Sequence, residues 1–196
     1  KSGFKISTTG VNVGDNVEIT TDTTDYIEFG DILIPNNNKL KVLLFLDSEC
    51  PLSISYSRTI NQLVKKFSNC NNNSVNFLFF LTHHNSPKSI LNIRKAYKES
   101  IECWESSNVE IHYKNRFQHP PFYLDSNHRI TNIINAEITP QCFLIDSLGK
   151  ILYRGAIDNW VVELGRKKQY INEHYLENAI EQYLNGDPIE ISHTKA

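Results

Sequence analysis

The chain has 196 residues, which is enough to bury the core of one domain without disulfides or a structural metal. Its 20 basic and 22 acidic residues give a formal net charge of −2, so the composition gives no reason to expect nucleic acid or an anionic membrane as a partner. No apolar run approaches the roughly 20 residues of a membrane-spanning helix.

The four cysteines are widely scattered and form neither a C-x-x-C pair nor a zinc-ligand spacing; they are Cys50, Cys70, Cys103 and Cys142. We expect one functional thiol among buried or incidental ones, with a bridge involving Cys70 or Cys103 left open. The chain starts at Lys1 and contains no methionine, which we interpret as a mature or trimmed segment without its targeting sequence.

Residues 1–25 are rich in Thr, Gly and Asn and predict a loose N-terminal extension. The stretch Tyr26–Ile34 has a β-rich composition and predicts a strand that ends at Pro35. Next, Val42–Leu46 is too short and too uniformly apolar for an amphipathic helix. It predicts a strand that is covered on both faces of a sheet.

Pro51 suits the first position of a helix and therefore places Cys50 at the N-cap. Unpaired N–H groups and the positive end of the helix dipole favour a thiolate over a thiol there, which predicts a nucleophile. The acidic Glu49 beside the sulfur opposes ionisation. In the alternative interpretation, Cys50 is only a small apolar residue at a helix start.

After Cys50, apolar residues recur at helical spacing as far as Phe67, and Val75–Leu81 predicts a second buried strand. Two such strands joined by a helix imply a right-handed crossover and parallel pairing. His83 and His84 end the second strand, so either one is a candidate to protonate a leaving thiol near Cys50. The alternative is two solvated loop histidines.

The dipeptide Ser86-Pro87 predicts the start of a helix that continues to about Ser100. Residues 102–121 are aromatic and irregular, and we interpret them as a lid or an insertion. The remaining predicted elements are a short helix over Asp125–Ala136, a hairpin of Gln141–Asp146 and Lys150–Arg154, and a closing helix over Glu173–Leu184.

Three stretches carry a resemblance to a known family: FLDSECPLS around Cys50, EITPQCFLID around Pro140, and LYRGAIDNW followed by LGRKK. Together they resemble the redoxin branch of the thioredoxin superfamily, which includes exported thioredoxin-like proteins labelled as thiol-disulfide isomerases. The resemblance implies an α/β thioredoxin-like fold, with a central mixed β-sheet flanked by helices and an N-terminal extension. We divide the chain into the extension 1–25, a thioredoxin-like domain 26–190 and a C-terminal tail 191–196.

The resemblance also implies a role for Thr139-Pro140, because the corresponding proline of the superfamily is cis and faces the active-site cysteine. Dithiol members carry a second cysteine three residues after the first, where this chain has Ser53. We therefore expect monothiol chemistry, in which Cys50 forms a mixed disulfide that an external thiol resolves. The Ser53 hydroxyl is a candidate to hydrogen-bond the thiolate, and Cys142 is an alternative resolving thiol that is better explained as a core residue.

Further candidates for substrate binding are Pro51, Glu49, His83 and His84, together with Arg154 and Asp158, which match the family pattern. For the last two we favour a structural ion pair over a place at the substrate groove. The expected partners are a protein or small-molecule thiol or disulfide client and an external reductant, in a periplasmic or extracytoplasmic location inferred from the family.

Two alternatives to this function stay open. The first is a non-catalytic binding module for a client peptide or a soft metal such as copper. A thiol with one or two histidines is a thin ligand set, so we assign no metal and no other cofactor. The second is a weak peroxiredoxin-type peroxidase. Peroxiredoxins have Thr or Ser where this chain has Asp47, and a carboxylate there repels the charge that develops during peroxide cleavage.

Overall fold

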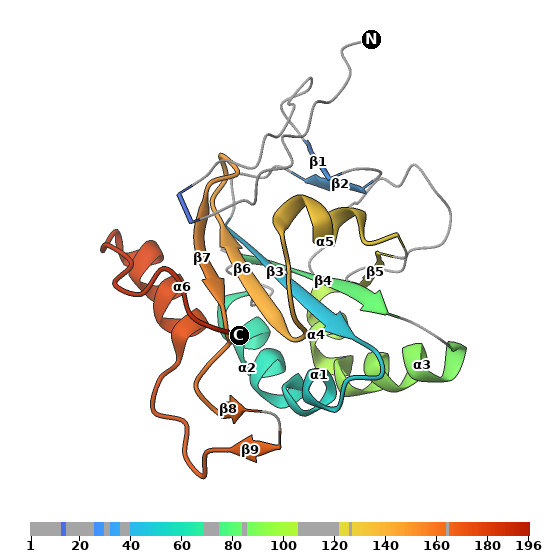
Figure 1. Cartoon of the computed structure of the whole chain (residues 1–196). Coiled ribbons are helices and arrows are strands. Elements are labelled where there is room, and N and C mark those ends of the chain that lie inside the picture. Colours follow the sequence, from blue (N-terminus) through green and yellow to red (C-terminus); the bar gives the residue numbers. More distant parts are fainter. Residues whose placement is uncertain are drawn as a thin grey trace.

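The computed structural model describes residues 13–14, 26–29, 32–35, 40–68, 75–83, 86–105, 122–125, 127–163 and 165–196. A five-stranded sheet with the order β5-β4-β3-β6-β7 forms its centre (Figure 1). The strands are β3 (Leu40–Asp47), β4 (Val75–His83), β5 (Phe122–Leu124), β6 (Gln141–Ile145) and β7 (Ile151–Gly155). Strands β3, β4 and β5 are parallel, whereas β6 runs antiparallel to both of its neighbours.

Helices lie on both faces of this sheet (Figure 1). They are α1 (Pro51–Ser55), α2 (Ser57–Phe67), α3 (Pro87–Ala96), α4 (Lys98–Glu105), α5 (Arg129–Ile134) and α6 (Tyr175–Asn185). Side chains of α2, α3, α4 and α6 join one buried cluster with the sheet, and side chains of α5 join the other. This mixed sheet between helices confirms the predicted α/β thioredoxin-like fold.

Side chains of the central strand β3 alternate between the two faces of the sheet. Helices cover both faces, so the strand is buried on both. Val42, Leu44 and Leu46 face the cluster that α2 and α6 cover. Leu43 and Phe45 face the cluster that α5 covers. The uniformly apolar sequence of this strand is therefore what a position between two helical layers requires.

Several boundaries differ from the predictions. The predicted single strand over Tyr26–Ile34 is instead an antiparallel pair, β1 (Tyr26–Phe29) and β2 (Ile32–Pro35). The helix after Cys50 is interrupted at Tyr56, and the helix predicted to Ser100 is interrupted at Tyr97. The short strands β5, β8 (Val161–Glu163) and β9 (Arg166–Lys167) were not predicted, because two or three residues carry no periodicity.

Other predicted segments lie partly outside the described residues. Of the lid or insertion predicted over 102–121, residues 102–105 belong to α4 and the rest lies outside the described part. The short helix predicted over Asp125–Ala136 is limited to Arg129–Ile134. The hairpin and the closing helix are confirmed, and α6 ends at Gly186, which has the positive φ of 80° expected at that position.

The predicted C-terminal tail hydrogen-bonds to the edge of β7. The Arg154 N–H donates to the Ser192 carbonyl at 3.1 Å, and the Thr194 N–H donates to the Arg154 carbonyl at 3.1 Å. Gly155 has φ of +143° and leaves no room for a Cβ atom, because the backbone and hydroxyl of Thr194 occupy that space. The division of the chain into three segments stays a prediction, but the last residues lie against the sheet.

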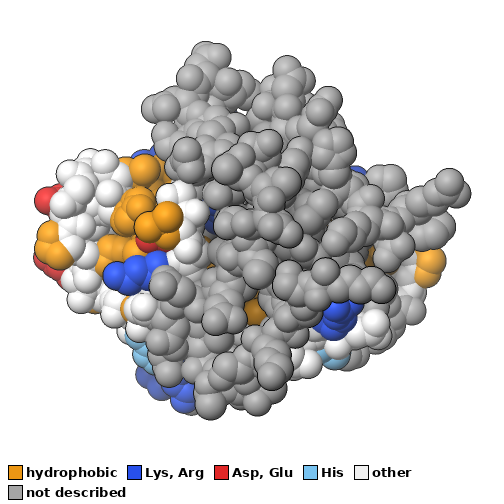
Figure 2. Space-filling view, turned by 90° about the horizontal axis from the view of Figure 1, so that it is seen from above, with side chains coloured by type: hydrophobic (Ala, Val, Ile, Leu, Met, Phe, Trp, Pro, Cys, Tyr) orange, Lys and Arg blue, Asp and Glu red, His pale blue; other side chains and the backbone are white. Residues whose placement is uncertain are grey.

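Viewed from above, hydrophobic side chains of the described part gather on the side where α6 lies in Figure 1 (Figure 2). The exposed large hydrophobic residues of α6 are Tyr183 and Leu184. Within the described residues, no helix is long and apolar enough to span a lipid bilayer.

Lys41 lies in the centre of the sheet with only 1% of its surface exposed. Burial lowers the pKa of its ammonium group from 10.5 to about 8, and the nearby Asp146 partly opposes this. Between pH 8 and pH 10.5 the unfolded chain binds more protons at Lys41 than the folded chain does. The free energy of unfolding therefore increases as the pH rises through this range. Relative to the Lys41→Met variant, the wild-type protein should gain about 2 to 3 kcal/mol of unfolding free energy between pH 7 and 10.5, as measured by urea titration. Parallel pH profiles for the two proteins would contradict this expectation.

Candidate functional site

Cys50 lies at the point where the chain leaves β3 and enters α1. Its N–H donates to the Asp47 carbonyl at 3.2 Å, which closes a tight turn. The backbone of Cys50 is extended, with φ of −73° and ψ of 117°, and Pro51 follows at the first helical position. Cys50 is the N-cap of α1, and its half-buried side chain makes no capping hydrogen bond to the helix.

The Thr139-Pro140 peptide bond, between α5 and β6, is cis. The Cys50 thiol donates to the Thr139 carbonyl at 3.5 Å, so the loop before β6 faces the sulfur. The neighbouring Gln141 holds this loop, because its side-chain oxygen accepts from the Glu137 N–H at 2.8 Å. The structure thus brings together Cys50 and Thr139-Pro140, which are 89 residues apart in sequence.

Ser53 has a different place from the one predicted. It is completely buried, and its hydroxyl oxygen accepts from the Asp47 N–H at 3.1 Å. Its carbonyl accepts from the Tyr97 hydroxyl at 2.6 Å. Among the described residues, Ser53 makes no hydrogen bond to the Cys50 sulfur. The predicted bond to the sulfur is therefore absent, because the Ser53 hydroxyl instead ties α1 to the end of β3.

Tyr97 lies beneath the start of α1, where its hydroxyl meets the Ser53 carbonyl. Burial raises the pKa of this phenol, and the negative charge of the Cys50 thiolate adds to the increase. Tyr97 therefore stays a neutral hydrogen-bond donor that fixes the first turn of α1.

The other described cysteines are poor candidates for a second redox thiol. Cys142 is fully buried in β6, and its thiol donates to the Gly155 carbonyl at 3.3 Å. Burial raises the pKa of this thiol, and the charge of Asp158 raises it further. The Cys103 thiol donates to the Ser68 carbonyl at 3.0 Å. Neither thiol is part of a disulfide, and Cys70 lies outside the described residues.

The predicted ion pair between Arg154 and Asp158 is wrong. The Arg154 guanidinium lies 3.3 Å from a Glu137 carboxylate oxygen and lies over the Phe143 ring, with 5.5 Å to the centroid. Strand alternation explains this, because Arg154 is paired with Phe143 in the sheet and shares the face that α5 covers.

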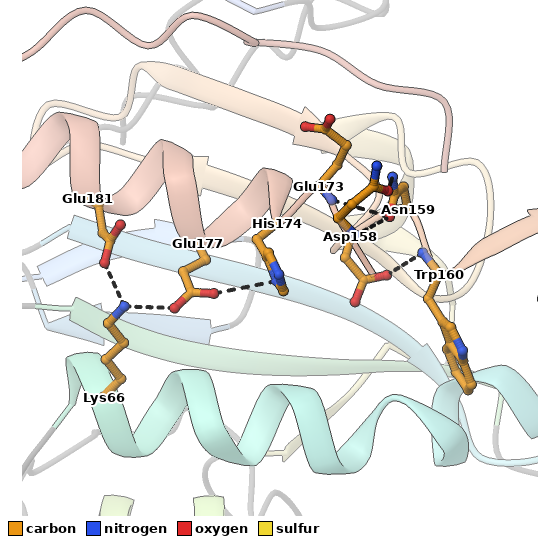
Figure 3. A network of polar contacts seen from close by, with 9 residues as sticks. Lys66, Asp158, Asn159, Trp160, Glu173, His174, Glu177 and Glu181 are labelled. Carbon is orange, nitrogen blue, oxygen red and sulfur yellow. Dashed lines mark hydrogen bonds and ion pairs between the residues drawn. The ribbon is translucent and has the colours of Figure 1, made fainter. Parts of the chain in front are cut away.

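Asp158 lies in the loop after β7 and is 2% exposed. One carboxylate oxygen accepts from the Tyr56 hydroxyl at 2.7 Å and from the Trp160 N–H at 2.8 Å. The other oxygen, Oδ2, is buried and has no hydrogen-bond partner (Figure 3). Burial raises the pKa of the Tyr56 phenol, and its hydrogen bond to Asp158 contributes. Tyr56 is therefore a donor to Asp158.

Figure 3 also shows how this loop is fixed to the helices. The Asn159 N–H donates to the Glu173 carbonyl, and the Asn159 side-chain oxygen accepts from the Glu173 N–H. Farther along α6, Glu177 and Glu181 both accept from the Lys66 ammonium of α2. The loop that carries Asp158 is thus tied to the segment that leads into α6, and α6 is in turn tied to α2.

A cavity of about 380 Å³ lies between this loop and the cis peptide bond. Its lining is mostly apolar and comprises Leu52, Tyr56, Ile138, Thr139, Pro140, Ala156, Ile157, Asp158, Val161, Val162, Lys195 and Ala196. Of these, only Asp158, Thr139 and Pro140 were predicted as site residues. Sequence reasoning did not select the remaining ones, because they come from four separate segments that only the folded chain brings together.

The remaining candidates lie around the sulfur or outside the described part. Glu49 and Pro51 are exposed on either side of Cys50. His83 is paired with Asp47 in the sheet register, but its side chain and all of His84 lie outside the described residues. In the described part of the chain, no group of three or more His, Cys, Asp or Glu side chains could hold a metal ion. The copper alternative therefore depends on residues outside that part.

No protein-family model and no curated protein matches this sequence. Among solved structures, the chain is similar to a hypothetical protein from Sinorhizobium meliloti, with a TM-score of 0.58 and 13% identity over 95% of this chain and 93% of that one. The thioredoxin domain of a thiol-disulfide oxidoreductase from Bacteroides vulgatus gives a TM-score of 0.48 and 13% identity, over 90% and 100% of the two chains. The first likeness supports a shared fold along nearly the whole chain and does not extend to activity.

Proposed function

We propose that this chain, which has a thioredoxin-like fold, carries out monothiol thiol-disulfide exchange through Cys50. The Cys50 thiolate attacks one sulfur of a client disulfide, and the other client sulfur leaves as a thiolate that takes up a proton. An external thiol then attacks the client sulfur of the mixed disulfide. This step joins the external thiol to the client and releases the Cys50 thiolate.

The observation that carries the proposal is the position of the Cys50 sulfur. It is half-buried at a helix start and lies 3.5 Å from the carbonyl of Thr139, a residue that lines a mostly apolar cavity. Helix N-terminal N–H groups stabilise a thiolate, and the effect is confined to the first turn, where Cys50 lies. Disulfide attack requires an accessible sulfur, and Cys50 lies where a helix start can support the attacking thiolate.

Among the residues that the structure describes, no second redox thiol lies near Cys50, which supports the monothiol mechanism. The position of the second cysteine is occupied by Ser53, which is completely buried. Cys142 is equally buried and its thiol resists ionisation. An external thiol is therefore the proposed resolving partner.

The backbone beside Pro140 supports a way of holding a client. The Thr139 carbonyl faces the Cys50 sulfur, so the Thr139 backbone lies where it can pair with the backbone of a client. The exposed Glu49 and Pro51 border the same sulfur. The client, its reductant and the extracytoplasmic location stay predictions.

The pH dependence of cysteine alkylation tests this proposal. The reduced protein is treated with iodoacetamide between pH 5 and 9, and each cysteine is quantified by mass spectrometry after quenching. We expect Cys50 to react first and at the lowest pH, and Cys142 to react last, because its thiol is buried and its pKa is raised. If Cys50 reacts no faster than it does in the unfolded protein, the proposal is wrong.

A further inference from the structure

Residues 192–196 run along the edge of β7, and we call this segment the strap. The chain end marked C in Figure 1 lies beside the end of β7. The backbone of Arg154 makes two hydrogen bonds of 3.1 Å with the strap, one to the Ser192 carbonyl and one from the Thr194 N–H. The strap therefore extends the sheet beyond β7 by a short parallel bridge.

Thr194 anchors the strap through its side chain. Its hydroxyl oxygen accepts from the Ala156 N–H at 2.9 Å and lies 2.6 Å from the Tyr153 hydroxyl. Thr194 also packs directly on Gly155, where a Cβ atom would collide with the hydroxyl and the backbone of Thr194. Because these contacts hold Thr194 against β7, they also fix the position of the two residues that follow it.

Those two residues, Lys195 and Ala196, form part of the wall of the cavity that Thr139 and Pro140 also line. Lys195 is exposed and Ala196 is half-buried, so both present surface that an occupant of the cavity can contact. The alanine methyl and the stem of the lysine are apolar, like most of the remaining wall. The strap thus links a hydrogen-bonded anchor on β7 to one wall of the cavity.

The Cys50 sulfur lies against another part of the same wall. It is 3.5 Å from the carbonyl of Thr139, and Leu52 in α1, two residues after Cys50, belongs to the lining as well. A group that a disulfide joins to Cys50 therefore starts beside the cavity.

We infer that the strap completes a binding site for the apolar group that a client carries next to its reacting sulfur. Lys195 and Ala196 contact this group, and Thr194 is the positioning residue that holds both in place. An apolar occupant loses more of its water-exposed surface in a cavity with this wall than in one without it. The inference rests on the proposed function for the nature of the client, and on the cavity and the strap for the contact.

Two reagents that differ only in the transferred group test the inference, methyl and benzyl methanethiosulfonate. The Cys50 thiolate attacks the sulfenyl sulfur, a disulfide forms between the two sulfurs, and methanesulfinate leaves. Site-resolved mass spectrometry after quenching gives both rates at Cys50, each relative to N-acetylcysteine amide. The ratio of the benzyl rate to the methyl rate reports the contact with the cavity, because a change in thiolate fraction cancels. We expect the wild-type ratio to exceed that of the free thiol about tenfold.

Thr194→Ala removes the hydroxyl that anchors the strap. The strap should then leave β7, so the amide hydrogens of Arg154 and Thr194 should exchange faster than in the wild type. The benzyl preference should fall about fourfold, which is the effect of losing one methylene-sized apolar contact. Thr194→Ser is the matched control, because serine keeps the hydroxyl, and it should keep both the slow amide exchange and the benzyl preference.

Gly155→Ala displaces the strap from the other side, because its Cβ atom needs the space that Thr194 occupies. It should lower the benzyl preference as Thr194→Ala does. Gly186→Ala is the control for backbone strain, since Gly186 also has a positive φ, of 80°, but has open space beside it. This control should keep the wild-type preference, and thermal melts check that all four variants are folded.

The inference is overturned if the wild type shows no benzyl preference, or if the preference stays or rises when the strap leaves β7. Slow amide exchange at Thr194 in both Thr194→Ala and Gly155→Ala also overturns it, because the strap would then be anchored elsewhere. The methyl reagent tests the proposed function separately. A Cys50 that reacts with it no faster than the free thiol contradicts an activated sulfur, whereas the benzyl preference still reports the strap.

Discussion

Replacing Cys50 by serine is expected to abolish the formation of mixed disulfides with a model disulfide. The loss should be at least a hundredfold, down to the uncatalysed background, because the hydroxyl of serine does not attack a disulfide. Incubation with a disulfide-linked fluorescent peptide, followed by non-reducing gel electrophoresis, measures the adduct. The Cys50 side chain contributes no helix capping bond, so the substitution should leave the melting temperature within a few degrees.

Cys103→Ser is the matched control for this experiment. Cys103 is the other partly buried thiol of the described chain, and it should be dispensable because its sulfur is engaged by the Ser68 carbonyl at 3.0 Å. Adduct formation that persists in Cys50→Ser and disappears in Cys103→Ser would place the reactive thiol elsewhere. If wild type and Cys50→Ser bind a client peptide equally and neither forms an adduct, the chain is a binding module.

Ser53→Cys is expected to convert the monothiol site into a dithiol site. Position 53 is three residues after Cys50 in the same helical turn, so the new thiol can attack the Cys50 sulfur of a mixed disulfide and release the client thiolate. An intramolecular step has an effective concentration of millimolar or more, so the lifetime of the mixed disulfide should fall at least tenfold without added thiol. The protein product is an internal disulfide, which mass spectrometry detects as the loss of two hydrogens.

Ser53→Ala is the control for the structural part of that change. Both substitutions weaken the hydrogen bond that Ser53 accepts from the Asp47 N–H, at a cost of about 1 kcal/mol, but only the cysteine can resolve a mixed disulfide. A lifetime shortened equally in Ser53→Ala would show that a looser helix start, rather than the second thiol, releases the client. An unchanged lifetime in Ser53→Cys would mean that the buried position keeps the new sulfur away from Cys50.

The sequence by itself determined the sheet and the place of the thiol. Val42–Leu46 is apolar throughout, and Val75–Leu81 is apolar at every position but one. Such a composition suits a strand that lies between two helical layers, and both strands form as predicted. Pro51 placed Cys50 at a helix start, because proline suits the first helical position and few others. These are local effects, so a local reading of the sequence finds them.

The tertiary structure alone decided the partners of the polar groups. Ser53 turns to the Asp47 backbone rather than to the sulfur, and Arg154 pairs with Glu137 rather than with Asp158. The cavity beside Cys50 takes its walls from segments as distant as Leu52 and Ala196. No spacing in the sequence encodes such contacts, because the side of the sheet and the register of strands far apart in the chain determine which side chains meet.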